Sequence, residues 1–182
     1  MTKKMDRRVK YTRALLKEAL IELLQEKHIS KISVKALCEK ADVNRSTFYT
    51  HFSNQFALLS HIQNEVKNNL KHFLEQYIDD RMPITEQNLI GILEYAKKNK
   101  ALFTVLLSEN SDQAFQKDLI ELVELIPFQY DIPLRKKEYI LNFAITGCIS
   151  VFHKWLREGA QESPREMATL VLQTIYRGLL SF

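Results

Sequence analysis

The chain has 182 residues, enough for one domain or two small ones, and 46% of them are hydrophobic, which permits a substantial buried core. Four glycines and four prolines are too few for a turn-rich β-sandwich or barrel, so we expect an all-α protein. The net charge is only +4, but residues 1–55 hold twelve of the 26 basic residues and only six of the 22 acidic ones. This basic N-terminal third favours a phosphate-binding module on a near-neutral body, although a solvated lysine-rich surface gives the same pattern.

Residues that carry chemistry are scattered along the chain. Cys38 and Cys148 lie far apart, without CxxC spacing or a histidine cluster, so we expect no metal and no cofactor. Clustered acids, bases and nucleophiles are missing too, so we expect no enzymatic activity. Two unpaired cysteines, and no apolar signal core or membrane-length apolar stretch, favour a cytoplasmic protein.

The N-terminal region is predicted to contain three helices. Residues 1–11 show no apolar period and are expected to form a mobile basic arm, and residues 12–53 a separate small domain. The first helix is predicted over Arg13–Lys27 with Thr12 as its N-cap. Tyr11 and Leu16 then stand at the positions of a hydrophobic staple.

Two short helices follow, and a tight turn joins them. The first is predicted over Val34–Lys40 with Ser33 as N-cap, and the second over Arg45–His51 with Asn44 as N-cap. Apolar residues stand at the staple positions around both caps. Two short helices joined in this way are typical of a helix-turn-helix, whose second helix enters the DNA major groove.

The outer face of the second short helix is the most informative surface in the sequence. At 100° per residue Phe48 and Phe52 point together into the core, and Ser46 and Thr50 then point most directly outward. Thr47 and Tyr49 flank these two residues, with Arg45 and His51 near the helix ends. This face carries no acid, and its groups can donate hydrogen bonds to phosphates and base edges.

Individual roles follow from residue type and position. Arg45 is the candidate for a bidentate contact to guanine, and Ser46 and Thr47 for contacts to base edges or a thymine methyl. The remaining candidates are expected to contact phosphates and so fix the position of the protein along the duplex, and some of them can also read bases. They are Ser33, Lys35, Asn44, Tyr49, Thr50 and His51.

Each role has a plainer alternative. Ser33 caps its helix with or without DNA, His51 can cap the end of the second short helix, and Tyr49 can pack on the first helix. The basic residues of the arm can be solvated, or can add sequence-independent affinity for DNA.

Residues 32–59 resemble the DNA-binding domain of the tetracycline-repressor (TetR/AcrR) family. The resemblance rests on the Val-Asn turn at residues 43–44, the Phe-Tyr-x-His-Phe motif at residues 48–52 and the Leu-Leu pair at residues 58–59. It is strong over about residues 10–60 and architectural elsewhere. The segment Asn-Arg-Ser-Thr-Phe-Tyr at residues 44–49 resembles the same segment in one branch of the family, which includes the activator of a dihydroxyacetone-kinase operon.

The resemblance implies an all-helical homodimer that binds a palindromic operator in double-stranded DNA and regulates transcription, most often as a repressor. Two departures stand out. Asp42 occupies a turn position where the family often has glycine, and aspartate tolerates that left-handed geometry. Gln55 replaces a lysine that usually offers a phosphate contact, so that contact is weakened.

Residues 54–182 are predicted to form a C-terminal helical domain. Helices are expected from Asn54 to about Asp79 and over 86–98, 101–107, 113–125, 134–158 and 163–180. Thr85 is the predicted N-cap of the helix over 86–98, and Ser163 that of the last helix. Together with the three N-terminal helices, these segments complete an all-α chain of two parts.

The last two helices carry wide apolar faces, each with a glycine in mid-helix that costs about 1 kcal/mol relative to alanine. Close approach of helices from two chains would offset that cost, and an ordinary intrachain core is the alternative. The expected dimer interface comprises Phe143, Gly147, Val151, Leu170, Thr174 and Gly178.

An effector site is the weakest of the expectations. Aromatic residues at helical spacing are usually plain core, but some can line a small-molecule pocket: Tyr95, Phe103, Phe115, Phe128, Tyr139, Phe152 and Trp155. Two rival readings remain open. One is an activator whose C-terminal domain binds a protein coactivator, and the other is a helical adaptor that does not bind DNA.

Overall fold

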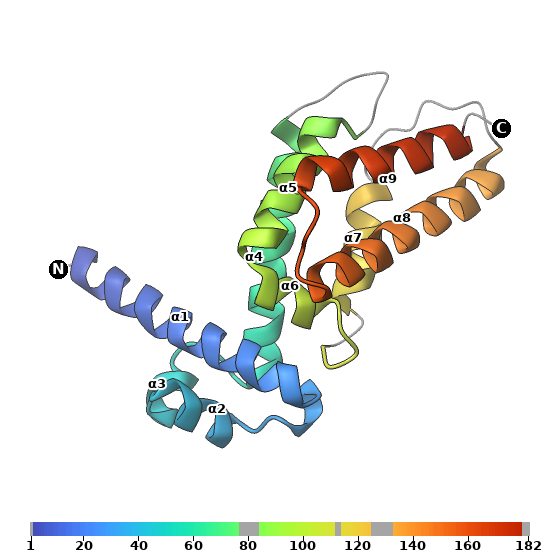
Figure 1. The fold of residues 1–182 in the computed structure, drawn as a ribbon. Helices are drawn as coiled ribbons and strands as arrows, with labels where there is room; N and C mark the ends of the chain where they lie inside the picture. The colour runs from blue at the N-terminus through green and yellow to red at the C-terminus, as the bar shows by residue number, and fades with distance from the viewer. Residues whose placement is uncertain (1, 77–83, 112–113, 125–132, 180–182) are drawn as a thin grey trace. The chain divides into compact units, whose positions relative to one another are not determined.

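The computed structural model describes residues 2–76, 84–111, 114–124 and 133–179, and every regular element in these ranges is helical (Figure 1). The all-α prediction is confirmed. The chain forms two compact units, Met1–Val66 with Ser108–Asp112, and Lys67–Leu107 with Gln113–Phe182. No described helix combines the length and apolarity that crossing a membrane requires.

The first unit contains α1 (Thr2–Glu26), the short 3₁₀ helix η1 (Ile29–Lys31), α2 (Val34–Ala41), α3 (Arg45–Tyr49) and the beginning of α4 (Gln55–Gln76). Helix α1 packs against α2, and α2 packs against α3 (Figure 1). The core that holds them consists of side chains with at most 1% exposure: Leu16, Leu20, Leu24, Ile29, Leu37, Phe48, Leu58, Leu59, Ile62 and Val66. Burial of these side chains determines which sides of α2 and α3 point to solvent.

Helix α1 begins eleven residues earlier than the sequence indicated, at Thr2 instead of Arg13. Thr12 lies inside the helix, so its prediction as an N-cap is wrong, and Tyr11 is 67% exposed and does not form a staple. Residues 2–11 are helical where a mobile arm was expected. They contain good helix formers and no glycine or proline, and the absence of an apolar stripe hid the helix from a periodicity argument.

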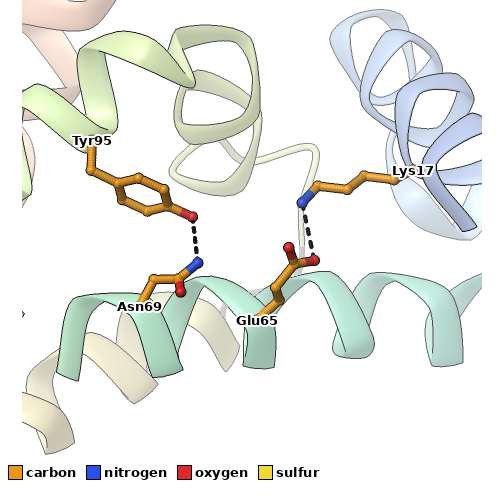
Figure 2. A network of polar contacts seen from close by, with 4 residues as sticks. All are labelled: Lys17, Glu65, Asn69 and Tyr95. Carbon is orange, nitrogen blue, oxygen red and sulfur yellow. Dashed lines mark hydrogen bonds and ion pairs between the residues drawn. The ribbon is translucent and has the colours of Figure 1, made fainter. Parts of the chain in front are cut away.

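The compact units divide within α4, after Val66, whereas the sequence placed the boundary before this helix. The reason is that Leu58, Leu59 and Ile62 of α4 complete the core of the first unit. A further link inside this unit is the ion pair between Lys17 Nζ of α1 and Glu65 Oε2 of α4, 3.1 Å apart (Figure 2).

The second unit contains the rest of α4 with α5 (Glu86–Lys98), α6 (Lys100–Leu106), α7 (Ala114–Glu124), α8 (Leu134–Arg157) and α9 (Pro164–Leu179). Helix α5 packs on α9, and α6 and α7 pack on α8. Within this unit the Asn69 amide donates a hydrogen bond to the Tyr95 hydroxyl (2.9 Å), which links α4 to α5 (Figure 2).

The two predicted caps of the C-terminal helices are confirmed. The Thr85 hydroxyl accepts from the Asn88 backbone N–H at the start of α5. Ser163 and Glu166 form the predicted capping box of α9, with Ser163 N donating to Glu166 Oε2 (2.8 Å) and Glu166 N donating to Ser163 Oγ (3.2 Å). The predicted end of α4 near Asp79 lies outside the described residues.

Candidate nucleic-acid interface

Local sequence chemistry sets the start of α2 and α3. Ser33 Oγ accepts from Ala36 N (3.1 Å), and Asn44 Oδ1 accepts from Ser46 N (2.9 Å), so both predicted N-caps are confirmed. Between the two helices Asp42 adopts φ 50° and ψ 44°, the left-handed geometry expected of this position. The turn therefore forms with aspartate in place of glycine.

The faces of α3 lie as the helical period predicted. Phe48 is fully buried and Phe52 is 7% exposed, whereas Tyr49 is 58% exposed. Arg45, Ser46 and Thr50 are exposed, and Thr47 and His51 are half-buried. The residues of α3 and its caps thus present an outer surface without a carboxylate. We call Arg45, Ser46, Thr47, Tyr49 and Thr50 the α3 face.

Two hydroxyls of the α3 face already donate hydrogen bonds within the chain. Ser46 Oγ donates to Asn44 Oδ1 (3.0 Å), and Thr50 Oγ1 donates to the Thr47 carbonyl (2.6 Å). Each hydroxyl keeps its lone pairs, so it can still accept a hydrogen bond. Arg45 is exposed, and within the described part of the chain it forms no ion pair. Its five guanidinium N–H groups leave it the richest donor on this surface.

Lys35 and His51, two of the predicted phosphate contacts, differ in charge. Lys35 Nζ lies 3.8 Å from Glu39 Oε1, an exposed i,i+4 pair that is worth only a few tenths of a kcal/mol and that a phosphate can displace. Burial, followed by the nearby Arg13 guanidinium, lowers the pKa of His51. At neutral pH His51 is therefore an uncharged imidazole that can donate a single N–H.

Arg13 is the residue that the sequence argument missed. Its guanidinium carbon lies 5.9 Å from the centre of the Phe52 ring, and its charge acts on His51, so α1 adds a cation beside the end of α3. The residue looked like the mere start of a helix in the sequence. Only the packing of α1 on the helix-turn-helix brings it to this surface.

The predicted dimer residues lie on an exposed apolar face of the second unit. Phe143 is 81% exposed, Leu170 56% and Val151 41%. The three smaller residues, Gly147, Thr174 and Gly178, are exposed too. All six line one groove between α8 and α9, together with Tyr139, Ile140, Ala144, Cys148, Val171 and Ile175. We call the six predicted residues the α8–α9 face.

Close packing against the described residues does not require glycine at either mid-helix position. A Cβ built on Gly147 or Gly178 meets no heavy atom within 4 Å. Thr174 Oγ1 donates to the Leu170 carbonyl (2.8 Å), so the threonine leaves its methyl group to the apolar face. Trp155 follows Val151 by four residues on α8, but it is 3% exposed and packs in the core.

Two family models match the chain. One describes bacterial regulatory proteins of the tetR family and covers residues 16–62, and the other describes a transcriptional regulator C-terminal region and covers residues 84–177. The first match contains the helix-turn-helix, and the second contains the α8–α9 face except for Gly178.

Relatives support the same assignment. The chain is 23% identical over 167 residues to YxbF, described as an uncharacterized HTH-type transcriptional regulator of Bacillus subtilis (strain 168). That match covers 89% of this chain but 44% of YxbF, so the chain spans less than half the length of this relative.

Two solved structures share the fold. A TetR transcriptional regulator from Streptococcus agalactiae 2603V is 25% identical, with a TM-score of 0.67 and coverage of 96% of this chain and 99% of that one. The dihydroxyacetone kinase operon activator DhaS is 19% identical, with a TM-score of 0.60 and coverage of 94% and 97%. The chain belongs to the TetR family of helix-turn-helix bacterial regulatory proteins.

Proposed function

We propose that α3 enters the major groove of an operator and that the α3 face reads it. The single observation that carries this proposal is an exposed recognition-helix surface free of carboxylates, with Arg45 at its start. In this proposal Arg45 contacts guanine and Thr47 a base edge or thymine methyl, and the Ser46 and Thr50 oxygens accept from bases. The phosphate contacts come from Tyr49, His51, Asn44, Ser33 and Lys35.

The chain acts as a homodimer through the α8–α9 face. An apolar face of this extent, with two mid-helix glycines beside which an added Cβ would find open space among the described residues, supports helix–helix packing between two copies. A dimer also explains specificity, because two α3 helices then read half-sites in successive major grooves of a palindromic operator. Since its target is bacterial DNA, the regulator works in the cytoplasm.

The C-terminal unit supplies control by a small-molecule effector. An effector changes DNA affinity only if it binds the DNA-competent and DNA-incompetent states differently. Repression is the proposed outcome, because a dimer that covers two half-sites blocks polymerase from the same DNA. The fold similarity to DhaS, named as an operon activator, keeps activation as the second candidate.

Binding to duplex DNA at several salt concentrations tests the proposal. We expect enrichment of one palindromic sequence from genomic fragments, with affinity that falls steeply as salt rises. The enriched site can then be placed upstream of a reporter promoter or overlapping it. A rise or a fall in reporter expression when the protein is present separates activation from repression. Absence of both sequence preference and salt dependence would refute DNA recognition and favour the helical-adaptor reading.

A further inference from the structure

The second unit contains a cavity of about 160 Å³ among α4, α5, α6, α7, α8 and α9. Engineered protein cavities of similar size accept an apolar molecule such as benzene, so the space suffices for a small ligand. Among the aromatic candidates of the sequence, Phe103 and Phe152 line it. Tyr139 lines the groove instead, Tyr95, Phe115 and Trp155 line neither space, and Phe128 lies outside the described residues.

The described wall of this cavity carries no charged side chain. It consists of aliphatic and phenylalanine side chains, with the Cys148 thiol and the Tyr176 hydroxyl as the polar groups. The hydroxyl donates to the Ile84 carbonyl (2.9 Å). Burial raises the pKa of Cys148 to about 11, so the thiol stays neutral near pH 7.

An ionised ligand group would find no partner on such a wall. Moving an ion from water into an apolar space is far more costly than moving a neutral chain, unless an opposite charge meets it. A neutral aliphatic chain, by contrast, gains about 25 cal/mol for each Å² of apolar surface that leaves water. The chemistry of the wall therefore discriminates by charge.

We propose that the cavity binds a neutral, mainly aliphatic molecule without an ionised group, and that this class of molecule is the effector. The proposal rests on the effector-controlled function above. It adds a chemical class to that function, which neither the fold nor the family match supplies.

The position of the cavity gives the ligand a route to the dimer. Ala144, Cys148, Val171 and Ile175 line both the cavity and the groove that contains the α8–α9 face. A single layer of side chains thus separates the ligand from that groove. A ligand that fills the cavity shifts this layer of side chains. Because packed cores switch between discrete arrangements, the shift changes how the α8–α9 faces of two copies pack against each other.

Three ligands with one chain length but different head groups test the chemical class on the full chain without DNA. They are 1-octanol, octyl sulfate and octyltrimethylammonium, each below its micelle-forming concentration. We expect 1-octanol to raise the thermal midpoint of unfolding by about 3 °C, since a ligand of the native state stabilises it by mass action. The two ions should leave the midpoint unchanged. Equal shifts with all three, or no shift with 1-octanol, overturn the proposal.

Two variants locate the binding at the cavity. Ala96 lines the cavity and Ala101 lies exposed on α6, so Ala96→Leu should abolish the octanol shift while Ala101→Leu keeps it. Leu119 is a half-buried residue of the same wall, and Leu119→Lys places a cation at its edge. This variant should gain stabilisation by octyl sulfate, a reversal that a misfolded protein cannot show. An octanol shift that survives Ala96→Leu, with no octyl sulfate gain in Leu119→Lys, places binding elsewhere and overturns the proposal.

Operator binding with and without 1-octanol separates this inference from the proposed function. A fall or rise in operator affinity of about tenfold, lost in Ala96→Leu, supports the effector role at a coupling typical of such proteins. An octanol shift without any change in DNA affinity refutes the effector role. Failure of the protein to bind any duplex DNA refutes the proposed function, while the thermal shifts still decide the ligand class.

Discussion

At the residue scale, the hydrogen bonds of α3 divide its outer side chains into two groups. The Ser46 and Thr50 hydroxyls donate within the chain, whereas Arg45 is exposed and forms no ion pair with the residues that the structure describes. The sequence predicted the direction of every side chain of the α3 face, because a 3.6-residue period fixes direction once Phe48 is buried. It did not predict which hydroxyls would be occupied, since that depends on rotamers and local partners.

Arg45→Ala should relax operator preference at one base-pair position and cost about 1–3 kcal/mol on the preferred site, because a bidentate guanine contact is lost. Lys35→Ala is the matched control at a phosphate position. It should weaken binding evenly across sequences and reduce the slope of log affinity against log salt by about 1. Selection from a randomised operator library measures both effects. Even, sequence-independent losses in both variants would contradict the role of Arg45.

The depressed pKa of His51 links stability to pH. The imidazole is held neutral by burial and by Arg13 in the native state, so its native pKa lies below the unfolded value. The unfolded chain then binds the proton more readily, and the contribution of His51 is present above the unfolded pKa near 6.5 and lost as pH falls through the native pKa.

The free energy of unfolding should therefore decline as pH falls below about 6.5, and His51→Gln should flatten part of this decline. Urea unfolding at several pH values measures it. His72→Gln, at an exposed position of α4, is the control. A steeper decline in His51→Gln than in the parent protein would show that the sign is wrong.

At the element scale, the short helices depend on their caps. Ser33, Asn44, Thr85 and Ser163 were all recognisable in the sequence, because a capping side chain precedes a fixed pattern of apolar residues. The start of α1 was not, because its first turns are polar and offer neither a cap nor a stripe. Arg13 was missed for a related reason, since its place beside α3 is a consequence of helix packing.

Asn44→Ala should destabilise the first unit by about 1 kcal/mol, because α3 has only five residues and loses the acceptor for Ser46 N. It should also weaken operator binding more than its lost contact alone explains, since α3 must order before it enters the groove. Hydrogen exchange of α3 amides and operator titration measure the two effects. Asn64→Ala, on the exposed side of α4, should change neither, and an unprotected α3 in the parent protein would contradict this account.

At the scale of the whole molecule, the sequence predicted a small domain over residues 12–53, and the first compact unit comprises Met1–Val66 with Ser108–Asp112. The α8–α9 face was predicted from two apolar stripes, which the structure leaves exposed. The cavity was not predicted, because the offsets between helices that leave it unfilled are a property of packing, not of any one stripe. Trp155 shows the limit, since a residue in register with an exposed face is buried in the core.

Phe143→Lys should raise the dimer dissociation constant by more than tenfold, because an 81%-exposed aromatic side chain at the centre of the proposed interface is replaced by a charge. Ser150→Lys, at an exposed position of α8 outside the groove, is the matched control and should leave dimerisation unchanged. Sedimentation equilibrium measures both. Equal dimerisation of the two variants would place the interface elsewhere.

Gly147→Ala is an independent test of whether α8 packs closely against a second copy at this interface. In one chain the added methyl group meets no atom within 4 Å, so the helix should gain up to about 1 kcal/mol from the better helix former. Between two closely packed helices the same methyl group is an obstruction, so dimer affinity should fall. Chemical denaturation at low protein concentration, compared with sedimentation, separates the two effects. A gain in both stability and dimer affinity would contradict close packing at this glycine.

The central claim is that two copies of the α3 face read DNA together, and footprinting on the genomic fragments that the protein selects tests it most directly. We predict two protected half-sites of inverted sequence, whose centres lie about 10 base pairs or a multiple of this apart. Arg45→Ala should lose the preference at one position within each half-site. A single asymmetric protected site, or uniform protection along every fragment, would contradict the claim.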